Sequence, residues 1–408
     1  MKYLNSQISW VLVTGALASV LPPADDPAQS KTKPLAPPVV LPLKWTTSSV
    51  YGPGLWMVDI SIGTPEQKQT LIFDPTFSDT EIHSSSDENF QAACKTEVPS
   101  FCSSWDYSAD VFQLGGVKLT NQTFAYAKAS EEPYGNLGLS PPATEVGFRL
   151  GGFPQYPTFM EQLVSQGVYD NACFSVWLDP QFPSDGFTTM PDGEVTFGGI
   201  DTGKFNGELI TLPVTTKVNN TAQAERWDLT LTGVTLGNDQ TNLSPKAVDC
   251  FVSVGGGEHS LPQDVYDSLA AAIPHSSFNP SIGLYEVPCD AKHDQNNKVT
   301  FTLSSPRTLI HPDGQHFSVE VPVEGFIWPM SVFLGADADP NTCTIAAVPM
   351  PEGTKRCNLG WTMSKGGYWV YDLFNGEISF APAAAKGEKP SQTIRVPKGG
   401  VAALALSH

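Results

Sequence analysis

The sequence predicts a mainly β protein of two related lobes, and three observations support this prediction. Charged residues make up only 16% of the 408-residue chain, whereas glycine and proline contribute 35 residues each, which is typical of short strands joined by many turns. Apolar runs with alternating faces recur between these turns, and helical periodicity is rare. Finally, an apolar strand that enters a tight turn, followed at a distance by an x-Leu-Gly motif, occurs once in each half of the chain.

The first half shows the strand pattern most clearly. Two alternating apolar runs, WMVDISIG and QTLIFD, flank a turn at Thr64-Pro65 and lead into Asp74-Pro75-Thr76, as in a half-buried hairpin. The motif Asn136-Leu137-Gly138 follows later in this half. In the second half, Ser253-Val254-Gly255 is followed in the same way by Asn358-Leu359-Gly360. We therefore expect two lobes of related structure, each containing one such turn.

Further strands and two helices are expected along the chain. The helices are expected over residues 157–166 and 262–273, where Gln263 and Asp264 occupy the favoured first turn of the second helix. The additional strands are expected at residues 110–114, 123–128, 174–178, 194–197, 227–231, 298–303, 368–372 and 377–381.

The N-terminal residues 1–18 predict a signal peptide. They contain one lysine, an apolar run and the small-x-small pattern Ala16-Leu17-Ala18, and the run is shorter than the ~20 residues that span a bilayer. Residues 19–44 are rich in proline and lack apolar periodicity, so we expect an extended leader or linker there. Secretion is the expected consequence.

The remaining chain divides into three expected parts: an N-terminal lobe at residues 45–215, a C-terminal lobe at 216–383 and a flexible tail at 384–408. The net charge of −19 and the pI near 4.6 argue against nucleic acid and anionic membranes as partners, because both would repel the protein. We expect a soluble monomer.

The seven histidines are scattered and no Cys-x-x-Cys or His-x-x-x-His spacing occurs, so neither a metal nor a cofactor is expected.

Seven cysteines in a secreted chain predict disulfides and one thiol left over. Cys94 and Cys102 are close enough in sequence to close a small loop, and Cys289 with Cys343 would close a longer one. The pairing of the other three cysteines stays open; they are Cys173, Cys250 and Cys357. Three sequons make candidate glycosylation sites, of which the last is weaker because Pro245 follows it; the acceptors are Asn121, Asn219 and Asn242.

A set of short motifs occurs in one order along most of residues 45–383. In that order the motifs resemble the pepsin-like aspartic proteases, particularly the secreted fungal members and their degenerate relatives. The resemblance implies a bilobal acid-protease fold with a cleft between two related β-rich lobes. The motifs are Ile62-Gly63-Thr64-Pro65-Glu66-Gln67, Phe73-Asp74, Leu137-Gly138-Leu139, Phe174-Ser175-Val176-Trp177-Leu178, Phe197-Gly198-Gly199-Ile200-Asp201, Leu261-Pro262 and Gly376-Glu377-Ile378-Ser379-Phe380-Ala381.

In that family each lobe presents an Asp-Thr-Gly or Asp-Ser-Gly turn, and the two carboxylates share one proton and hold a water molecule between them. The resemblance places Asp74 and Ser253 at these two catalytic positions. Pro75 has neither a hydroxyl nor a backbone N–H, and Thr76 replaces a glycine, so its Cβ would be costly at a positive φ. Serine is uncharged and is a poor base without an activating neighbour. Both positions are therefore predicted to be non-functional in catalysis.

The family's flap, a Gly-rich hairpin with a tyrosine, has no recognisable counterpart between His83 and Asp110. Asp201-Thr202-Gly203 spells the catalytic triplet but matches a structural turn of the family. A hydrolase triad of Ser253, His259 and Asp249 is disfavoured because all three lie in one short segment without a nucleophile-elbow pattern.

These observations favour a secreted, catalytically inactive homologue that binds a peptide, a protein or a glycan in the cleft between the lobes. The alternative is an active aspartic-type endopeptidase with a non-standard dyad, in which a displaced acid such as Asp249 joins Asp74. A third hypothesis is that the protein is a secreted glycoprotein with a purely structural role and no ligand.

Overall fold

The computed structural model divides the chain at Pro34, and the second unit, Leu35–His408, contains every helix and strand that the structure describes. The described residues are 34–47, 54–83, 104–129, 134–145, 154–182, 190, 192–218, 221–237, 242–244, 246–254, 257–293, 297–305, 315–334, 339 and 341–404.

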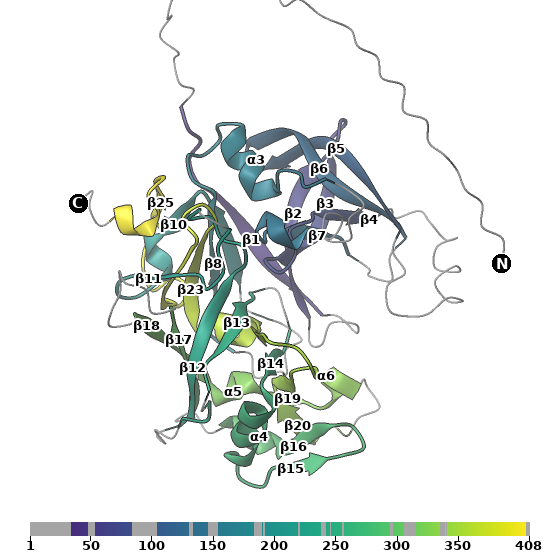
Figure 1. The fold of residues 1–408 in the computed structure, drawn as a ribbon, viewed down its shortest axis with the longest axis vertical. Coiled ribbons are helices and arrows are strands. Elements are labelled where there is room, and N and C mark those ends of the chain that lie inside the picture. Colours follow the sequence, from purple (N-terminus) through teal and green to yellow (C-terminus); the bar gives the residue numbers. More distant parts are fainter. Residues whose placement is uncertain are drawn as a thin grey trace, which may run out of the picture. The chain divides into compact units, whose positions relative to one another are not determined.

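A twelve-stranded sheet is the largest element in the described part of the chain, with the strand order β11-β24-β23-β8-β9-β1-β2-β3-β7-β4-β6-β5 (Figure 1). It crosses the expected lobe boundary at residues 215 and 216, because β8 pairs with β23. Its strands are β1 (Val39–Thr46), β2 (Leu55–Ile62), β3 (Gln67–Asp74), β4 (Glu81–His83), β5 (Ser104–Leu114), β6 (Val117–Ala129), β7 (Asn136–Gly138), β8 (Cys173–Leu178), β9 (Gly193–Phe197), β11 (Ile210–Pro213), β23 (Gly367–Asp372) and β24 (Glu377–Pro382).

Three smaller sheets complete the described strands. The seven-stranded sheet has the order β18-β17-β12-β13-β22-β14-β21 and contains β12 (Asp228–Leu236), β13 (Val248–Val252), β14 (His259–Leu261), β17 (Lys298–Ser304), β18 (His316–Pro322), β21 (Ala347–Pro349) and β22 (Cys357–Leu359). The four-stranded sheet, β15-β16-β20-β19, contains β15 (Ser277–Asn279), β16 (Leu284–Pro288), β19 (Ile327–Pro329) and β20 (Thr342–Ile345). The two-stranded sheet pairs β10 (Gly199–Asp201) with β25 (Thr393–Arg395).

The helices are short, and the two longest confirm the sequence pattern. α3 spans Phe159–Ser165 within the expected range 157–166, and it begins with a capping box in which Thr158 and Glu161 satisfy each other's backbone N–H groups. α4 spans Gln263–Ala271 within the expected range 262–273. In the described part of the chain, no helix has the length and apolar composition needed to cross a membrane. The other helical turns are η1 (Pro142–Thr144), η2 (Thr202–Lys204), η3 (Cys289–His293), α5 (Val323–Phe326), α6 (Ser331–Leu334), α7 (Trp361–Ser364) and η4 (Val401–Ala403).

Residues 39–44, which lie in the expected leader or linker at 19–44, belong to the sheet. β1 pairs with β9 over residues 39–43 and with β2 over residues 43–46, and its first six side chains alternate between buried and exposed. Pro42 lies opposite Glu194 in the ladder with β9 and precedes the ladder with β2. The proline-rich composition concealed a strand whose partner, β9, lies some 150 residues further along the chain.

Much of the segment after residue 384 is likewise held in place, although the sequence predicts a flexible tail there. Thr393–Arg395 pairs with β10, and Val396 and Val401 are buried. Arg395 also donates hydrogen bonds to the backbone oxygens of Leu35 and Ala36, at 3.1 and 2.9 Å. The C-terminal segment is thus tied both to the rest of the fold and to the residues that precede β1.

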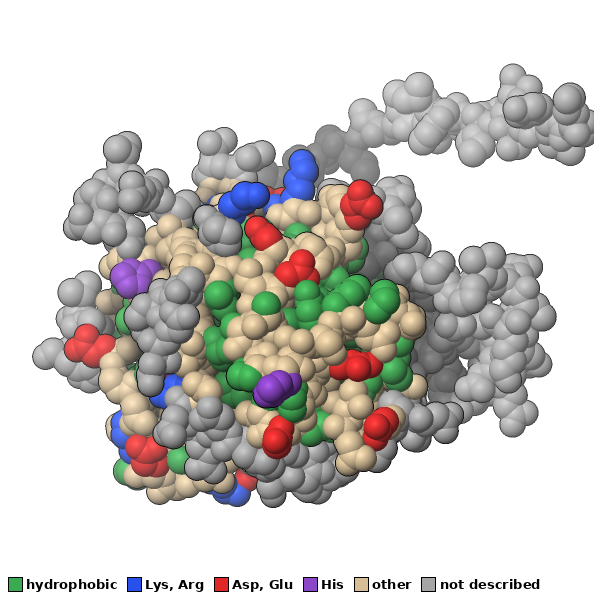
Figure 2. All heavy atoms as spheres, turned by 90° about the horizontal axis from the view of Figure 1, so that it is seen from below, with side chains coloured by type: hydrophobic (Ala, Val, Ile, Leu, Met, Phe, Trp, Pro, Cys, Tyr) green, Lys and Arg blue, Asp and Glu red, His purple; other side chains and the backbone are tan. Residues whose placement is uncertain are grey.

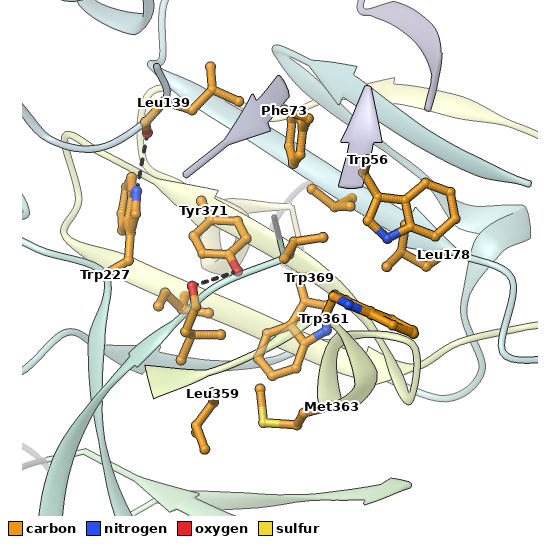
Figure 3. Close-up of a cluster of buried hydrophobic side chains, with 14 of the residues drawn as sticks. Trp56, Phe73, Leu139, Leu178, Trp227, Leu359, Trp361, Met363, Trp369 and Tyr371 are labelled. Atoms are coloured by element: carbon orange, nitrogen blue, oxygen red, sulfur yellow. Dashed lines mark hydrogen bonds between the residues drawn. The ribbon is translucent and has the colours of Figure 1, made fainter. Parts of the chain in front are cut away.

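One aromatic core lies between the elements that carry the two related turns (Figure 3). Phe174 of β8 stacks on Tyr371 of β23 with ring centroids 4.8 Å apart, and Trp227 meets Tyr371 edge-on at 5.3 Å. Phe73, one residue before Asp74, packs edge-on against Phe174 at 6.0 Å. Burial of such large rings is a principal source of stability, so the turns rest on a well-packed base.

In the face shown in Figure 2 the acidic side chains lie at separate places, and some of them lie beside Lys or Arg side chains. The net charge of −19 therefore forms no concentrated acidic patch on this face.

Candidate active site

Asp74 lies at the end of β3, in a turn that β7 holds from one side. β3 and β7 are parallel, with Phe73 opposite Leu137 and Asp74 opposite Gly138. The N–H of Leu139 donates to the backbone oxygen of Asp74 at 2.9 Å. A Cβ on Gly138 would lie 2.4 Å from the backbone oxygen of Asp79, so the turn after Asp74 passes closely over this glycine.

Ser253 occupies the same arrangement in the second half. β13 ends at Val252 and is parallel to β22, with Val252 opposite Leu359. The N–H of Ser253 donates to the backbone oxygen of Leu359 at 3.0 Å. A Cβ on Gly360 would lie 2.2 Å from the backbone oxygen of Gly257. The strand, turn and x-Leu-Gly pattern that occurs once in each half of the sequence is therefore a structural repeat, in which each x-Leu-Gly strand supports one turn.

The aromatic core connects these two turns. The indole N–H of Trp227 donates to the backbone oxygen of Leu139 at 3.2 Å, and the hydroxyl of Tyr371 donates to the backbone oxygen of Val252 at 3.2 Å (Figure 3). Because the rings of Trp227 and Tyr371 are in contact, both turns rest on the same pair of side chains. The structure thus brings the two predicted positions onto one support.

The carboxyl group of Asp74 is bound by its own turn. Its Oδ1 accepts a hydrogen bond from the N–H of Thr76 at 2.7 Å and another from the Thr76 hydroxyl. Thr76 is not among the described non-glycine residues with a positive φ, so its Cβ introduces no backbone strain. The glycine-to-threonine change instead adds a donor to the carboxyl group.

Burial raises the pKa of Asp74, and the hydrogen bonds from Thr76 and Phe77 oppose this rise. The causes of the shift include no charged neighbour among the described residues. In a catalytic dyad the second carboxylate would be the dominant influence, because like charges at contact distance split the two pKa values. Asp74 therefore behaves as a single buried carboxyl group.

Ser253 is completely buried, and its backbone oxygen accepts a hydrogen bond from the Ser364 hydroxyl at 3.2 Å. The side chain in this position is a hydroxyl group, which carries no charge over the range in which a carboxylate acts as base. The hydrogen-bonding group at the first turn is thus the carboxyl of Asp74, whereas the second turn carries the hydroxyl of Ser253 at the position of the family's second carboxyl group.

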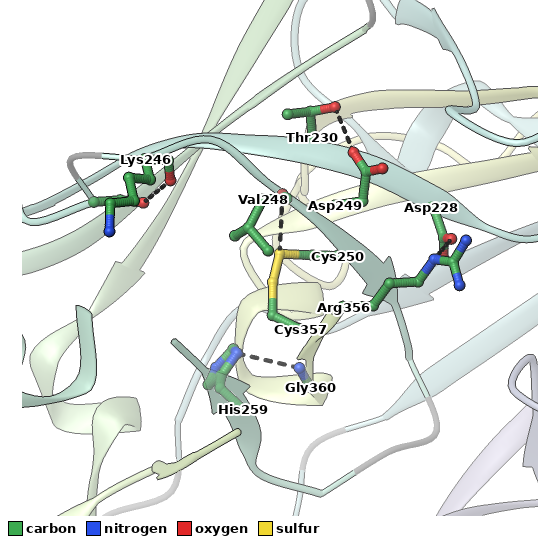
Figure 4. The surroundings of a disulfide bond; sticks show 11 residues. Asp228, Thr230, Lys246, Val248, Asp249, Cys250, His259, Arg356, Cys357 and Gly360 are labelled. Carbon is green, nitrogen blue, oxygen red and sulfur yellow. Dashed lines mark hydrogen bonds and ion pairs between the residues drawn. A yellow bond between two sulfur atoms is a disulfide. The ribbon is translucent and has the colours of Figure 1, made fainter. Parts of the chain in front are cut away.

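Asp249 is not brought to the position of Ser253. It lies in β13, where its Oδ1 accepts a hydrogen bond from the hydroxyl of Thr230 at 2.9 Å (Figure 4). It precedes Ser253 by four residues, which corresponds to roughly 13 Å along an extended strand. The structure therefore gives no support to a displaced dyad of Asp74 and Asp249.

His259 is fixed by neutral partners. Its Nδ1 accepts the N–H of Gly360 at 3.1 Å, so the proton lies on Nε2, which is 2.6 Å from the Thr362 hydroxyl oxygen. The ring lies between Phe301 and Phe326, and burial lowers its pKa to about 3. Both nitrogens are occupied, so His259 is a structural residue and does not activate Ser253.

Asp201, in the triplet Asp201-Thr202-Gly203, anchors the C-terminal segment. The carboxyl group is buried and accepts hydrogen bonds from the N–H groups of Gly203 and Gln392, at 2.9 and 2.8 Å, and from the Ser391 hydroxyl at 2.5 Å. The interpretation of this triplet as a structural turn agrees with these contacts. The C-terminal partners were not foreseen, because they lie about 190 residues away in sequence.

Two disulfides are present in the described structure. Cys250 is bonded to Cys357 across the parallel pair β13 and β22, directly before the Ser253 turn (Figure 4). Beside it, Arg356 forms an ion pair with the buried Asp228 at 2.9 Å. The second disulfide joins Cys289 to Cys343, as the sequence suggested. Cys173 is a buried free thiol, and Cys94 and Cys102 lie outside the described residues.

The predicted glycosylation sites differ in their surroundings. Asn121 is exposed on β6 and has a φ of 54°. The side-chain amide of Asn242 bonds the backbone of Thr232, Val234 and Ser244, at 2.9 to 3.0 Å. Asn219 and most of the segment expected to replace the flap, residues 84–103, lie outside the described residues.

A recess of about 550 Å³ lies elsewhere on the surface, against β1, β9 and the C-terminal segment, where it is lined by residues such as Trp45, Glu194 and Lys386. It includes neither Asp74 nor Ser253. Within the described ranges, no group of three or more His, Cys, Asp or Glu side chains is arranged to hold a metal ion.

One feature near Asp74 carried no sequence signal. Asp79 and Glu145 are both buried and both contact Tyr156, although Glu145 stands alone among apolar and small residues in the sequence. No local pattern predicts that three distant segments converge on two carboxyl groups.

Comparison with known proteins agrees with this geometry. The sequence profile described as eukaryotic aspartyl protease matches residues 100–383. A probable aspartic-type endopeptidase, OPSB of Arthroderma benhamiae, is 32% identical over 289 residues, which cover 68% of this chain and 53% of that protein. The aspartic proteinase yapsin-3 of Saccharomyces cerevisiae is 24% identical over 366 residues, which cover 80% of this chain and 66% of that protein. This chain spans about half the length of the first of these relatives.

The crystal structure of the aspartic proteinase from Irpex lacteus matches with a TM-score of 0.62 at 18% identity, over 86% of this chain and 100% of that chain. At this identity the match shows the fold. It confirms the prediction of a pepsin-like architecture in which two β-rich lobes each contribute one central turn. The profile match and the 32% identity to the OPSB endopeptidase show that the chain belongs to the eukaryotic aspartyl protease family.

Proposed function

We propose that this protein is a secreted, catalytically inactive member of the aspartyl protease family that binds an extended polypeptide at the position of the family's active site. The observation that carries the proposal is Ser253, which stands in the turn equivalent to that of Asp74 and has a hydroxyl group where the mechanism needs a carboxyl group. Water activation in this family depends on two carboxyl groups sharing one proton. One buried carboxyl group does not provide this.

The retained features suit binding. Because burial raises its pKa, Asp74 stays protonated to a higher pH than an exposed aspartic acid does, and a neutral carboxyl group can donate a hydrogen bond to a peptide carbonyl. Phe77, three residues later, is 47% exposed although Ser78 and Asp79 beside it are buried. An exposed aromatic ring beside a hydrogen-bond donor is a favourable contact for an apolar side chain of a bound peptide.

Secretion is supported by the signal-peptide pattern at residues 1–18 and by the two disulfides in the described structure. Disulfides persist in oxidising compartments and are rare in the cytosol. The net charge of −19 keeps such a protein soluble.

A peptide-capture experiment tests the proposal. The immobilised protein is exposed to a tryptic peptide mixture at pH 4.5, and retained peptides are identified by mass spectrometry. We expect intact peptides to be retained, and Asp74→Ala and Phe77→Ala each to weaken their binding by about fivefold or more, or roughly 1 kcal/mol.

Asp249→Asn is the matched control, because Asp249 bonds to Thr230 and lies on the strand before the Ser253 turn. This variant should retain the same peptides. Absence of any retained peptide would overturn the proposal, and so would new cleavage products that disappear in the Asp249→Asn variant.

A further inference from the structure

The tetrapeptide Phe-Asn-Gly-Glu occurs twice in the chain, at residues 205–208 and 374–377. An asparagine followed by glycine is prone to deamidation, because glycine has no Cβ to hinder attack by its own backbone nitrogen on the asparagine side chain. The two asparagines, Asn206 and Asn375, have the same immediate neighbours and therefore closely similar intrinsic reactivity. A difference between them in the folded protein comes from the structure.

Asn375, in the turn between β23 and β24, is held on several sides. Its Nδ2 donates to Oδ2 of Asp372 at 2.9 Å and to the backbone oxygen of Lys398 at 3.1 Å, so both protons of the side-chain amide are bound. Its backbone N–H donates to Oδ1 of Asp372 at 3.1 Å. Gly376 is buried, and a Cβ on it would lie 2.1 Å from the backbone oxygen of Ala222. The glycine nitrogen therefore cannot approach the side-chain carbonyl of Asn375 unless these contacts break.

Asn206, between η2 and β11, is held at fewer points. Its backbone N–H donates to the backbone oxygen of Pro382 at 2.8 Å. Its side-chain amide makes one hydrogen bond to the described residues, from Nδ2 to Oε1 of the exposed Glu388 at 3.2 Å. Gly207 is exposed with a φ of 76°, and a Cβ on it would meet no atom within 4 Å. The turn thus has open space around the peptide unit that must move for the attack.

We propose that Asn206 is a site of spontaneous deamidation in the folded protein, whereas the fold protects Asn375. The backbone nitrogen of Gly207 bonds to the side-chain carbonyl carbon of Asn206, and the bond from that carbon to Nδ2 breaks. The amide nitrogen takes up the proton of the Gly207 N–H and leaves as ammonia. Water then opens the succinimide ring at either of its carbonyl groups, which leaves aspartate or isoaspartate. The reaction consumes water and needs no enzyme.

The product changes the contact of this turn with the C-terminal segment. Glu388 connects the two, because its Oε1 accepts from Nδ2 of Asn206 and its Oε2 accepts from the N–H of Ala385 at 2.8 Å. After deamidation a carboxylate stands in place of the amide donor, so repulsion between like charges replaces a hydrogen bond. The ammonium group of Lys389 lies in the same region and donates to the backbone oxygen of Phe205 at 2.8 Å. Solvent screens exposed charges, so we expect a local loosening of the segment and no loss of the fold.

Trypsin makes a direct comparison possible, because it separates the two sites into the peptides 205–217 and 366–386, each with a single asparagine. The folded full chain is incubated at pH 8, and the mass gain from amide to acid is followed in both peptides. A second sample is incubated in concentrated guanidinium chloride with its disulfides reduced. We expect closely similar rates at the two sites in the denatured chain. In the folded protein Asn206 should convert at least about tenfold faster than Asn375, a difference of about 1.4 kcal/mol in activation free energy.

Asn206→Gln is the control for the assignment, because glutamine keeps the amide but closes the larger ring far more slowly. The peptide 205–217 of this variant should stay unmodified while Asn375 behaves as in the wild type. An Asn206 that converts in denaturant but stays intact in the folded protein would overturn the proposal. Equal rates at Asn206 and Asn375 in the folded protein would do the same.

Asn206→Asp imitates the product and tests its consequence. Amide hydrogen exchange should show protection in residues 383–390 falling by about threefold in this variant. Adding Glu388→Gln should restore the protection, because the glutamine can donate to Asp at position 206 and still accept from Ala385. Unchanged protection in Asn206→Asp, or a fall that persists after Glu388→Gln, would refute the link to the C-terminal segment.

Discussion

Replacing Gly138 and Gly360 by alanine tests the structural repeat beneath the two turns. A Cβ on Gly138 would lie 2.4 Å from the backbone oxygen of Asp79, and one on Gly360 would lie 2.2 Å from that of Gly257. Ordinary contact begins near 3.4 Å, so in each case backbone atoms must move by about 1 Å. Overpacking of this kind costs roughly 1–3 kcal/mol, and backbone contacts place both variants towards the upper end.

Urea denaturation of each purified variant measures this cost. Gly233→Ala is the matched control, because its Cβ would meet the side chains of Thr302 at 3.4 Å and Asn242 at 3.6 Å, which are ordinary contact distances, and Gly233 is not among the described glycines with a positive φ. We expect a loss of about 2–3 kcal/mol for Gly138→Ala and for Gly360→Ala, and a change below about 1 kcal/mol for the control. If the free energy of unfolding of either turn variant equals that of the wild type, the close approach of that turn to its x-Leu-Gly strand is refuted.

Three further predictions follow from the site and its surroundings. Ser253→Asp alone should not produce proteolysis of a denatured substrate at pH 3 to 5, because Pro75, Thr76 and Phe77 remain; robust activity in this variant would show that those positions matter little. His259 is neutral in the folded protein and takes a proton in the unfolded chain below about pH 6.5. The free energy of unfolding of the wild type should therefore fall by about 2–3 kcal/mol between pH 6.5 and 4.5. Calorimetry of His259→Gln should find a smaller fall over the same range. A chain that ends at residue 390 should have a free energy of unfolding about 2–5 kcal/mol lower than the full chain, because it loses the burial of Val396 and Val401 and the pairing of β25. Equal stability of the two chains would support the prediction of a flexible tail.

The parts of the fold that the sequence predicted depend on local pattern. The β3 turn and its echo at Ser253 were visible because an apolar strand and an x-Leu-Gly strand recur in each half, and the structure pairs them in parallel. α3 lies within the predicted range 157–166, and the structure shows that it begins with a local capping box of Thr158 and Glu161. Such features are encoded within a few residues, so they can be read directly.

The parts that the sequence missed depend on distant contacts. Residues 391–395 are held by Asp201 and by β10, about 190 residues earlier, and their local sequence gives no sign of such partners. Whether Glu145 holds a proton depends on its burial against Asp79 and Tyr156, which no spacing in the sequence specifies. The disulfide between Cys250 and Cys357 was left open for the same reason, because only the register of β13 with β22 brings those residues together.

We expect that the single carboxyl group of Asp74 does not support peptide-bond hydrolysis, and a cleavage assay tests this expectation most directly. The purified protein is incubated at pH 3 to 5 with a denatured protein substrate, with and without pepstatin, beside an Asp74→Ala variant. We predict no pepstatin-sensitive cleavage and no difference between wild type and variant. Cleavage that pepstatin inhibits and Asp74→Ala abolishes would contradict the claim.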